Sequence, residues 1–579
     1  MLSPKYYFYL ALNSEGQSKI GVTSNPRIDA YLLDQDGFCE MHLLQPPLPV
    51  WVAELVVQKV AHTPRVHAPA KFQKIISQLV NEIFPQKHFT LSRYLLYEIK
   101  PDTFDPPEIE TLFWGRSLLG SEIPELLKAN GVELPWDPED WMQYLYFNGK
   151  IQREAAVSRD FLGIPFCKRC GATSDVVEND CIFCGSKHCF TCNNCQTMGL
   201  AKSCIPLYAS AYPGATPNSA GKVEPQLDFD LTPPQQRASG ELVKFLDSKE
   251  PQFLVWAVCG GGKTEVSFQV VARVLTDGGR VLFAIPRKDI VTELLPRFQK
   301  AFPGIEIIAL YGGSGGRFAD APFIIATTHQ CLRFYQRFDL VILDEADAFP
   351  YQGSEMLHFA VKRSVKPGGH MIIMTATPDG NMIRKAGQGK IPYVSIPARP
   401  HRKPLVVPDI VKIALDCPPN SSSFWEPPRH IERCLIEGRD NQRRFMIFLP
   451  TIKMIDDIGN GLVKWGVTKG LRGACAHAKS PNRDQVKEEL LTGKIDYLIT
   501  STIFERGITI PNLDVFVLFA DYETIFDART LIQIAGRVSR RGEPAQVTFL
   551  AKTISRSMKD CCNVIASMNT EGYKLGFLD

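Results

Sequence analysis

One stretch limits the folds open to this chain more than any other. Residues 253 to 271 read FLVWAVCGGGKTEVSFQVV, an apolar run, then a glycine-rich turn, then a polar segment. The run FLVWAV is typical of a strand buried on both faces of a parallel sheet, and the residues from Thr264 through EVSFQVVARVL read as a helix. We therefore expect an α/β fold with an anion site at the strand-to-helix turn, where backbone N–H groups and the positive end of the helix dipole converge.

The turn itself has the residues that a nucleotide phosphate needs. Glycines let the backbone approach an anion closely, and three stand in a row, namely Gly260, Gly261 and Gly262. Lys263 is expected to reach the β- and γ-phosphates, and the Thr264 hydroxyl to ligate Mg²⁺. Ala257 stands where the familiar phosphate loop begins with glycine, so this turn alone also fits an ordinary βα connection.

A second motif, which is acidic, follows the glycine-rich turn by about eighty residues. FDLVILDEADAF places an apolar strand directly before a run of carboxylates. At the carboxyl end of a strand beside a phosphate loop, Asp344 is expected to hold Mg²⁺ and Glu345 to polarise the attacking water. Together the two motifs predict an ATPase with ATP and Mg²⁺ as its cofactors.

Further motifs occur in a fixed order around this pair: LTPPQ (231–235), PRKDIVTELLPRF (286–298), ATTHQ (326–330), TATP (375–378), STIFERGITIP (501–511) and QIAGRVSRR (533–541). With the glycine-rich turn as motif I and DEAD as motif II, the ordered set over roughly residues 228 to 555 resembles the motifs of superfamily 2 helicases. In that order, the six segments correspond to motifs Q, Ia, Ib, III, V and VI. In that family alanine is accepted at position 257.

The resemblance implies two RecA-like lobes with ATP between them. It implies that Gln235 reads the adenine, that Arg537 and Arg540 approach the γ-phosphate as fingers, that Gln533 contacts the same interface, and that Gly507 marks a tight turn. By the same resemblance, nucleic-acid phosphates would be held by Arg287, Thr328 and Thr502, contacts that track a backbone without reading sequence.

Eight of the sixteen cysteines lie between residues 167 and 204. Zinc takes four soft ligands in a tetrahedron, and a CxxC turn supplies two of them. Eight cysteines suit two sites, and both sequential and cross-braced pairings fit the spacing. His188 could replace one of the cysteines, and Cys189 and Cys204 are the two ligands that the pattern supports least. The expected zinc ligands are Cys167, Cys170, Cys181, Cys184, Cys189, Cys192, Cys195 and Cys204.

A cysteine cluster placed just before such a motor narrows the resemblance. CxRCG, then CNNCQTMGLAKSCIPLY, then LTPPQQRAS, is similar to the ComFA-type late-competence DNA-uptake ATPases of transformable Gram-positive bacteria, over roughly residues 160 to 555. In that family the four-cysteine core would correspond to Cys167, Cys170, Cys192 and Cys195, and the pair Cys181–Cys184 exceeds it.

The resemblance to this family implies an activity and a cellular location. It implies a motor that pulls incoming single-stranded DNA through a membrane channel, with a phosphoribosyltransferase-like partner (ComFC) and the channel protein ComEC. A cytoplasmic location, peripheral at the inner face of the membrane, follows from the same resemblance. No apolar run reaches the roughly eighteen residues of a membrane span, and the short YYFYLAL run does not read as a signal peptide.

Composition shifts suggest a domain order. We expect an α+β accessory domain at 1–155, a zinc module at 156–208, a linker at 209–226, one RecA-like lobe at 227–415 and a second at 430–579 with its C-terminal tail. In the accessory domain YYFYLAL, CEMHLL and VWVAELVV read as β-rich runs and KFQKIISQLVNEIF as a helix.

Two other functions remain compatible with these residues. One is a duplex-unwinding DNA or RNA helicase of the replication-restart kind. The other is a zinc-bearing DNA-binding scaffold that uses ATP as a switch, although such a scaffold has no need of Glu345, Arg537 and Arg540. The formal net charge of +3 does not by itself indicate nucleic acid.

Overall fold

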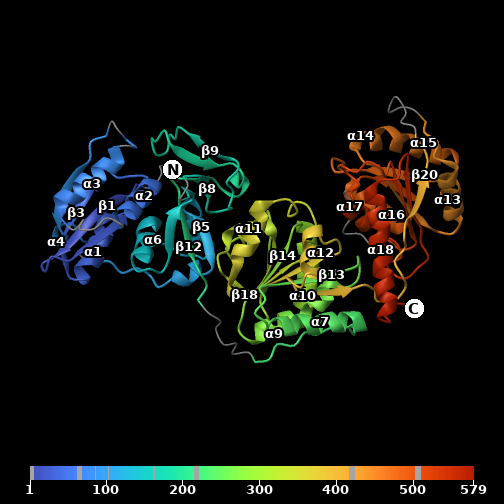
Figure 1. Ribbon diagram of the computed structural model, residues 1–579, viewed down its shortest axis with the longest axis horizontal. Coiled ribbons are helices and arrows are strands. Elements are labelled where there is room, and N and C mark those ends of the chain that lie inside the picture. Colours follow the sequence, from blue (N-terminus) through green and yellow to red (C-terminus); the bar gives the residue numbers. More distant parts are fainter. Residues whose placement is uncertain are drawn as a thin grey trace. The chain divides into compact units, whose positions relative to one another are not determined.

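The computed structural model describes residues 5–61, 68–81, 83–84, 87–101, 103–160, 163–213, 221–415, 424–502 and 510–579 (Figure 1). The chain divides into two compact units. The first comprises Met1–Lys222, Val274–Ile342 and Phe349–Met371, and the second comprises Val223–Arg273, Leu343–Ala348 and Ile372–Asp579. The mixed α/β fold predicted from the sequence is confirmed.

The first unit begins with an antiparallel sheet of order β2-β1-β3-β4. Its strands are β1 (Tyr7–Asn13), β2 (Ser18–Thr23), β3 (Phe38–Gln45) and β4 (Thr90–Leu95), and its helices are α1 (Pro26–Gln35), α2 (Val50–Ala61), α3 (Pro69–Asn81) and α4 (Leu96–Ile99). Apolar residues spaced four apart on α3, Phe72, Ile76 and Val80, pack into the same core as Phe8 and Leu10 of β1.

One predicted strand in this region is wrong. VWVAELVV lies in helix α2, whose first turn is closed by hydrogen bonds from Val52 N and Ala53 N to Pro49 O. Val52, Val56 and Val60 recur at helical spacing and are buried in the core under the sheet. Tertiary packing of this apolar face outweighs the β propensity of the valines.

A second sheet, of order β5-β12-β6, follows in the same unit. It is antiparallel and consists of β5 (Arg116–Leu119), β12 (Pro206–Ser210) and β6 (Gln152–Ala155), which pack with α5 (Ile123–Ala129) and α6 (Pro138–Phe147). The whole cysteine segment therefore leaves this sheet after β6 and returns to it at β12 (Figure 1). Within the segment lie β7 (Val157–Arg159), β8 (Pro165–Cys167), β9 (Val176–Asn179), β10 (Cys189–Cys192) and β11 (Ala201–Lys202).

The glycine-rich turn belongs to a sheet of order β15-β16-β14-β17-β18-β13-β19. The strands are β13 (Gln252–Ala257), β14 (Val281–Ile285), β15 (Ile307–Leu310), β16 (Phe323–Thr327), β17 (Phe338–Leu343), β18 (Val365–Thr375) and β19 (Tyr393–Ile396). The pairs β13–β19, β14–β16 and β15–β16 are parallel. The associated helices are α7 (Pro233–Phe245), α8 (Lys263–Val266), α9 (Phe268–Thr276), α10 (Lys288–Ala301), α11 (Glu355–Ser364) and α12 (Gly380–Gly387).

The helix predicted after the turn is divided in two. α8 ends at Val266 and α9 begins at Phe268, and between them Ser267 Oγ donates to Thr264 O over 2.6 Å. A serine hydroxyl that binds a backbone carbonyl one turn back competes with the helical ladder, which explains the break.

An all-parallel sheet of order β20-β25-β24-β21-β23-β22 lies wholly in the second unit. Its strands are β20 (Asp409–Lys412), β21 (Arg444–Phe448), β22 (Gly473–Ala476), β23 (Tyr497–Thr500), β24 (Leu513–Leu518) and β25 (Val547–Ala551), with helices α13 (Arg429–Asp440), α15 (Asn460–Thr468), α16 (Arg483–Thr492), α17 (Ala528–Ala535) and α18 (Arg556–Lys574). The three apolar runs RRFMIFLPT, DYLITST and DVFVLFA form β21, β23 and β24 as predicted.

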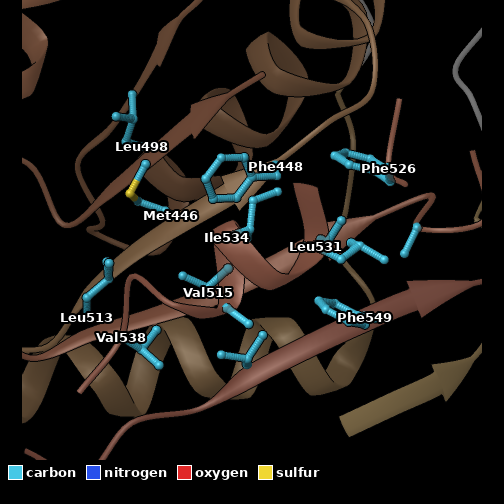
Figure 2. Packing of buried hydrophobic residues seen from close by; sticks show 14 of the residues in the cluster. Met446, Phe448, Leu498, Leu513, Val515, Phe526, Leu531, Ile534, Val538 and Phe549 are labelled. Carbon is cyan, nitrogen blue, oxygen red and sulfur yellow. The ribbon is translucent and has the colours of Figure 1, made fainter. Parts of the chain in front are cut away.

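Helix α17 is fixed on this sheet by its apolar face. Figure 2 shows Leu531 and Ile534 beside strand residues such as Phe448 and Val515 in one buried cluster. At the other end of the helix, the Asp527 side chain caps the first turn by accepting from Thr530 N over 2.8 Å. The motif QIAGRVSRR therefore begins on a helix whose orientation is set by core packing.

Within the described residues, no helix is both long and apolar enough to cross a membrane.

Candidate functional site

The glycine-rich turn runs from the end of β13 to the start of α8. Gly260 and Gly262 have φ values of +78° and +86°, in the left-handed region that favours glycine. A Cβ built on Gly262 would lie 2.0 Å from Gln235 Nε2, so this position must also be glycine for steric reasons. Gln235 itself is buried, accepts from Thr232 N (2.9 Å) and donates to Gly261 O (3.1 Å). The predicted adenine reader thus supports the shape of the turn.

Lys263 and Asp344 are brought together across the ends of neighbouring structural elements. Lys263 Nζ at the start of α8 lies 3.2 Å from Asp344 Oδ1, just after β17, and Asp344 is 5% exposed. Burial alone would lower the pKa of Lys263, but the carboxylates of Asp344, Glu345 and Asp347 raise it above its ordinary value. The lysine is therefore a positive charge at the start of α8, beside the carboxylates of the DEAD motif.

Glu345 follows Asp344 in a strained backbone conformation. Its φ of +52° lies in the left-handed region, which is uncommon for a residue with a side chain. Its N–H donates to Asp344 Oδ1 over 2.8 Å, which ties the two acidic residues together. Strain of this kind persists where the surroundings fix a residue, as they do at functional sites.

Asp347, two residues further on, is the centre of a hydrogen-bond network. Its Oδ1 accepts from Thr375 Oγ1 and its Oδ2 from Thr377 Oγ1, both over 2.7 Å, and Gln533 Nε2 reaches Oδ2 over 3.2 Å. The motifs DEAD, TATP and QIAGRVSRR therefore meet on one buried carboxylate, and Thr264, also buried, lies at the phosphate turn of the same unit.

The two arginines predicted as fingers follow α17 directly. Arg537 is buried, and Arg540 Nε donates to Gly536 O over 3.2 Å. Gln533, on the preceding turn, also accepts from Cys259 Sγ through Oε1 over 3.2 Å. Motif VI therefore contacts the residue that directly precedes the glycines of the phosphate turn.

The predicted nucleic-acid contacts are placed in different surroundings. Arg287 precedes α10 and pairs with Asp289 over 3.1 Å. Thr328 begins the turn Thr328–Arg333 with its side chain fully buried, so its hydroxyl faces the protein interior. Thr502 is half-buried, and Gly507 lies outside the described residues, as do residues 214–220 of the predicted linker. All three contacts stay predictions.

The eight clustered cysteines form two separate groups of four. One group is Cys167, Cys170, Cys192 and Cys195, and the other is Cys181, Cys184, Cys189 and Cys204. In each group the sulfur atoms all lie within 4.8 Å of one another. In the first group, three Sγ–Sγ distances are 3.6, 3.8 and 3.9 Å, and in the second Cys181 and Cys204 are 3.9 Å apart.

These distances fit a tetrahedral metal site. A Zn–S bond of about 2.3 Å gives a sulfur–sulfur edge of about 3.8 Å in a regular tetrahedron. Each group also has a buried cation beside it, which a zinc tetrathiolate of net charge −2 would balance. Lys202 Nζ lies 3.9 Å from Cys181 Sγ, and the fully buried Arg169, inside the Cys167–Cys170 turn, has no hydrogen-bond partner for Nε and Nη1 among the described residues.

The grouping follows from strand register. β10 pairs antiparallel with β9, setting Cys189 opposite Asn179 and Cys192 opposite Val176. Cys189, at one end of β10, belongs to the second group of cysteines, and Cys192, at the other end, belongs to the first. The ligands of the two groups therefore alternate along the chain. Spacing alone allows sequential or cross-braced pairing of the cysteines, and the observed grouping is cross-braced. In its second group the Cys181–Cys184 turn is joined by Cys189 and Cys204.

Comparison with known proteins agrees with this architecture. Family profiles match in chain order: "Competence protein ComFA N-terminal domain" at residues 103–209, "Type III restriction enzyme, res subunit" at 228–380 and "Helicase conserved C-terminal domain" at 427–542. The competence protein ComFA of Bacillus subtilis (strain 168) is 35% identical over 477 residues, which is 80% of this chain and 98% of that protein. The chain belongs to the ComFA family.

A second ComFA, from Streptococcus pneumoniae (strain ATCC BAA-255 / R6), is 34% identical over 70% of this chain and 90% of that protein. Among solved structures, RecG bound to a three-way DNA junction aligns at 20% identity with a TM-score of 0.43, over 60% of this chain and 46% of that chain. The profile matches and the ComFA relatives make this protein a competence-related, helicase-like ATPase of superfamily 2 with two RecA-like domains, for which ATP and Mg²⁺ are the implied cofactors.

The ComFA profile ends at residue 209, within β12, and so spans the sheet β5-β12-β6 together with both cysteine groups. Glu122, beside this sheet, is buried between two arginines: Arg169 Nη2 lies 3.1 Å from its Oε2 and Arg333 Nε 2.8 Å from its Oε1. Arg333 ends the turn that starts at Thr328. A single carboxylate therefore links the first cysteine turn to the segment of motif Ib.

The first unit contains a cavity of about 840 Å³ whose lining includes no residue of the ATPase motifs. It is lined by residues around the starts of α5 and α6 and by Phe183 of the second cysteine group. The lining has no pair of groups that would carry out phosphate chemistry.

Two residues of the ATP site escaped prediction. Asp347 is inside the DEAD motif, but its role depends on Thr375 and Thr377, which are adjacent only in the folded chain. Among the described residues, the Arg399 guanidinium donates to four backbone carbonyls, and no sequence pattern marks those acceptors.

Proposed function

We propose that this ComFA-family ATPase is a translocase of single-stranded DNA that drives the uptake of transforming DNA during natural competence. The observation that carries the proposal is the Asp347 network. It joins the metal-binding motif, the threonines of TATP and the glutamine of motif VI in one set of hydrogen bonds. A nucleotide bound at the adjacent turn would change this set, and motors of this kind convert such changes into movement along a strand.

The chain's own residues divide the work of hydrolysis. Lys263 would exchange Asp344 for the β- and γ-phosphate oxygens, which leaves the Asp344 carboxylate for Mg²⁺ together with the Thr264 hydroxyl. Glu345 would orient the attacking water, and Gly260, Gly261 and Gly262 would present backbone N–H groups to the phosphates. Arg537 and Arg540 would stabilise the charge that develops on the γ-phosphoryl group.

The two cysteine groups would each hold one zinc ion. A closed Cys₄ site has no open position for substrate, so its contribution is to folding and to the placement of neighbouring segments. Arg287 and Thr502 are proposed to contact the DNA backbone, whereas the Thr328 side chain, which is fully buried, could do so only after this segment rearranges. The resemblance to the family also suggests a ComFC-type partner, the ComEC channel, and a site of action in the cytoplasm at the inner face of the membrane.

Steady-state ATP hydrolysis tests the proposal. It is measured with no polymer, single-stranded DNA, duplex DNA and single-stranded RNA, each at two salt concentrations, with the Lys263→Ala protein as the blank. We expect the strongest stimulation by single-stranded DNA and a marked loss of stimulation at high salt, because phosphate contacts release counterions. Equal or stronger stimulation by RNA or duplex DNA would instead identify an unwinding helicase, and no stimulation would identify an ATP-switched scaffold.

A further inference from the structure

Arg399 lies three residues after β19 and is 3% exposed. Its guanidinium donates four hydrogen bonds, all to backbone carbonyls. The acceptors are Cys259 O for Nε (2.8 Å), Val538 O and Ser539 O for Nη1 (2.6 and 2.9 Å), and Gly536 O for Nη2 (2.9 Å). A planar fork of donors is the group that can bind several carbonyls at once.

The acceptors belong to two functional segments. Cys259 directly precedes the glycines of the phosphate turn. The other three carbonyls follow α17 and flank Arg537, at a helix C-terminus where the last carbonyls have no intrahelical partner. A cation there also interacts favourably with the helix dipole. Arg399 therefore supplies hydrogen-bond donors to the carbonyls that follow α17. With the same guanidinium it binds the carbonyl of Cys259, just before the phosphate turn.

The packing around Arg399 leaves little freedom. A Cβ built on Gly536 would lie 2.5 Å from Cys259 Cβ and 2.7 Å from its Sγ, so the end of α17 rests directly on the phosphate turn. Nearby, a Cβ on Gly542 would come within 3.2 Å of the His401 ring. The segment around residues 399–401 thus follows the motif VI loop along its length.

We propose that Arg399 is a positioning residue for ATP hydrolysis, which fixes the loop bearing Arg537 and Arg540 against the phosphate turn. The proposal rests on the finger roles proposed for those two arginines. Arg540 Nε donates to Gly536 O, the same carbonyl that Arg399 binds. Two guanidinium groups therefore share one acceptor, and their mutual repulsion favours transfer of Arg540 to a γ-phosphate once ATP is bound.

The charge relation between these arginines supports this picture. Burial and, next to it, the neighbouring charge of Arg540 together lower the pKa of Arg399 to about 10. Arg399 stays charged at neutral pH, so the repulsion is present whenever the site lacks an anion.

The test compares Arg399→Ala and Arg399→Lys with the wild-type protein. Arg402→Ala is the matched control, since Arg402 belongs to the same segment but is exposed and binds Asp579. For Arg399→Ala we expect kcat to fall by at least about tenfold, with binding of a fluorescent ATP analogue changed by less than about threefold, because the phosphate contacts are intact. Lysine should restore little, since one ammonium cannot bind carbonyls on both segments.

Hydrolysis without any polymer is measured alongside, so the test holds whether or not single-stranded DNA is the stimulating polymer. A kcat for Arg399→Ala within about twofold of wild type would overturn the proposal. It would also be overturned if the affinity for the ATP analogue fell by as large a factor as kcat.

Amide hydrogen exchange gives a readout that does not need activity. In the ligand-free Arg399→Lys protein we expect faster exchange at residues 536–541 and unchanged exchange in β21 and β24. Unchanged exchange at 536–541 would refute the positioning role, and so would a uniform loss of protection that includes β21, because Arg399 would then be needed for folding as a whole.

Discussion

Gln533 Nε2 donates to Asp347 Oδ2 over 3.2 Å, and the same oxygen accepts from Thr377 Oγ1. This contact joins the helix of motif VI to the acidic motif that follows β17, with both groups buried. It makes the position of α17 sensitive to any change at the carboxylates of the DEAD motif.

Gln533→Ala should uncouple these motifs while leaving the phosphate turn intact. We expect kcat to fall by about tenfold with KM for ATP changed little, since the lost bond joins α17 to Asp347 and the phosphate turn is unchanged. Steady-state kinetics with Gln236→Ala as the control would check this, because Gln236 is exposed and its side chain donates to Leu231 O, away from Asp347. A selective rise in KM would contradict the assignment.

Lys263→Ala should abolish turnover. The substitution removes the phosphate partner and leaves the buried Asp344 carboxylate without its ion pair. ATP hydrolysis is compared with Lys244→Ala, whose lysine pairs with Glu241 on the surface and should be dispensable. Near-normal hydrolysis by the Lys263 variant would refute the phosphate clamp.

Glu345→Gln should separate binding from chemistry. The amide keeps the size of the side chain but cannot accept a proton, so single-turnover hydrolysis should slow by about a hundredfold or more while ATP still binds. Full DNA-stimulated turnover in this variant would rule out Glu345 as the group that activates water.

The purified protein should contain two zinc ions per chain. Elemental analysis of Cys192→Ser and Cys189→Ser should each show one ion fewer, since these residues belong to different groups. Cys39→Ser is the control, because Cys39 is exposed and outside both groups. One ion or none in the wild-type protein would break the proposed grouping.

Glu122→Gln should destabilise the first unit. It leaves two buried guanidinium groups facing a neutral amide, and breaking a buried ion pair on one side costs about 3–5 kcal/mol. Glu125→Gln is a matched control three residues away, where an exposed pair with Arg317 contributes about 1 kcal/mol or less. Urea unfolding gives both values, and equal effects would show that Glu122 has no special role.

The sequence was informative where chemistry depends on neighbours along the chain. Lys263, Thr264, Asp344 and Glu345 were predicted because a turn or a strand end fixes their spacing. Helix α2 was misread because its valines follow β propensity locally, while burial of its apolar face is decided by a sheet formed elsewhere.

Partners that meet only after folding could not be predicted in this way. Arg399 binds carbonyls, which every residue has, and Asp347 binds threonines from a different strand. The division of the cysteines depends on the register of β9 against β10, which spacing alone leaves open.

The position of β12 between β5 and β6 has a practical consequence. A protein shortened to begin at residue 156 would lack both neighbours of this strand, whose residues are all buried in the full chain. Its two uncovered edges and apolar side chains would favour pairing between molecules. Such a fragment should precipitate or form irregular oligomers even with its cysteine groups intact, whereas one that begins before β5 should remain dispersed.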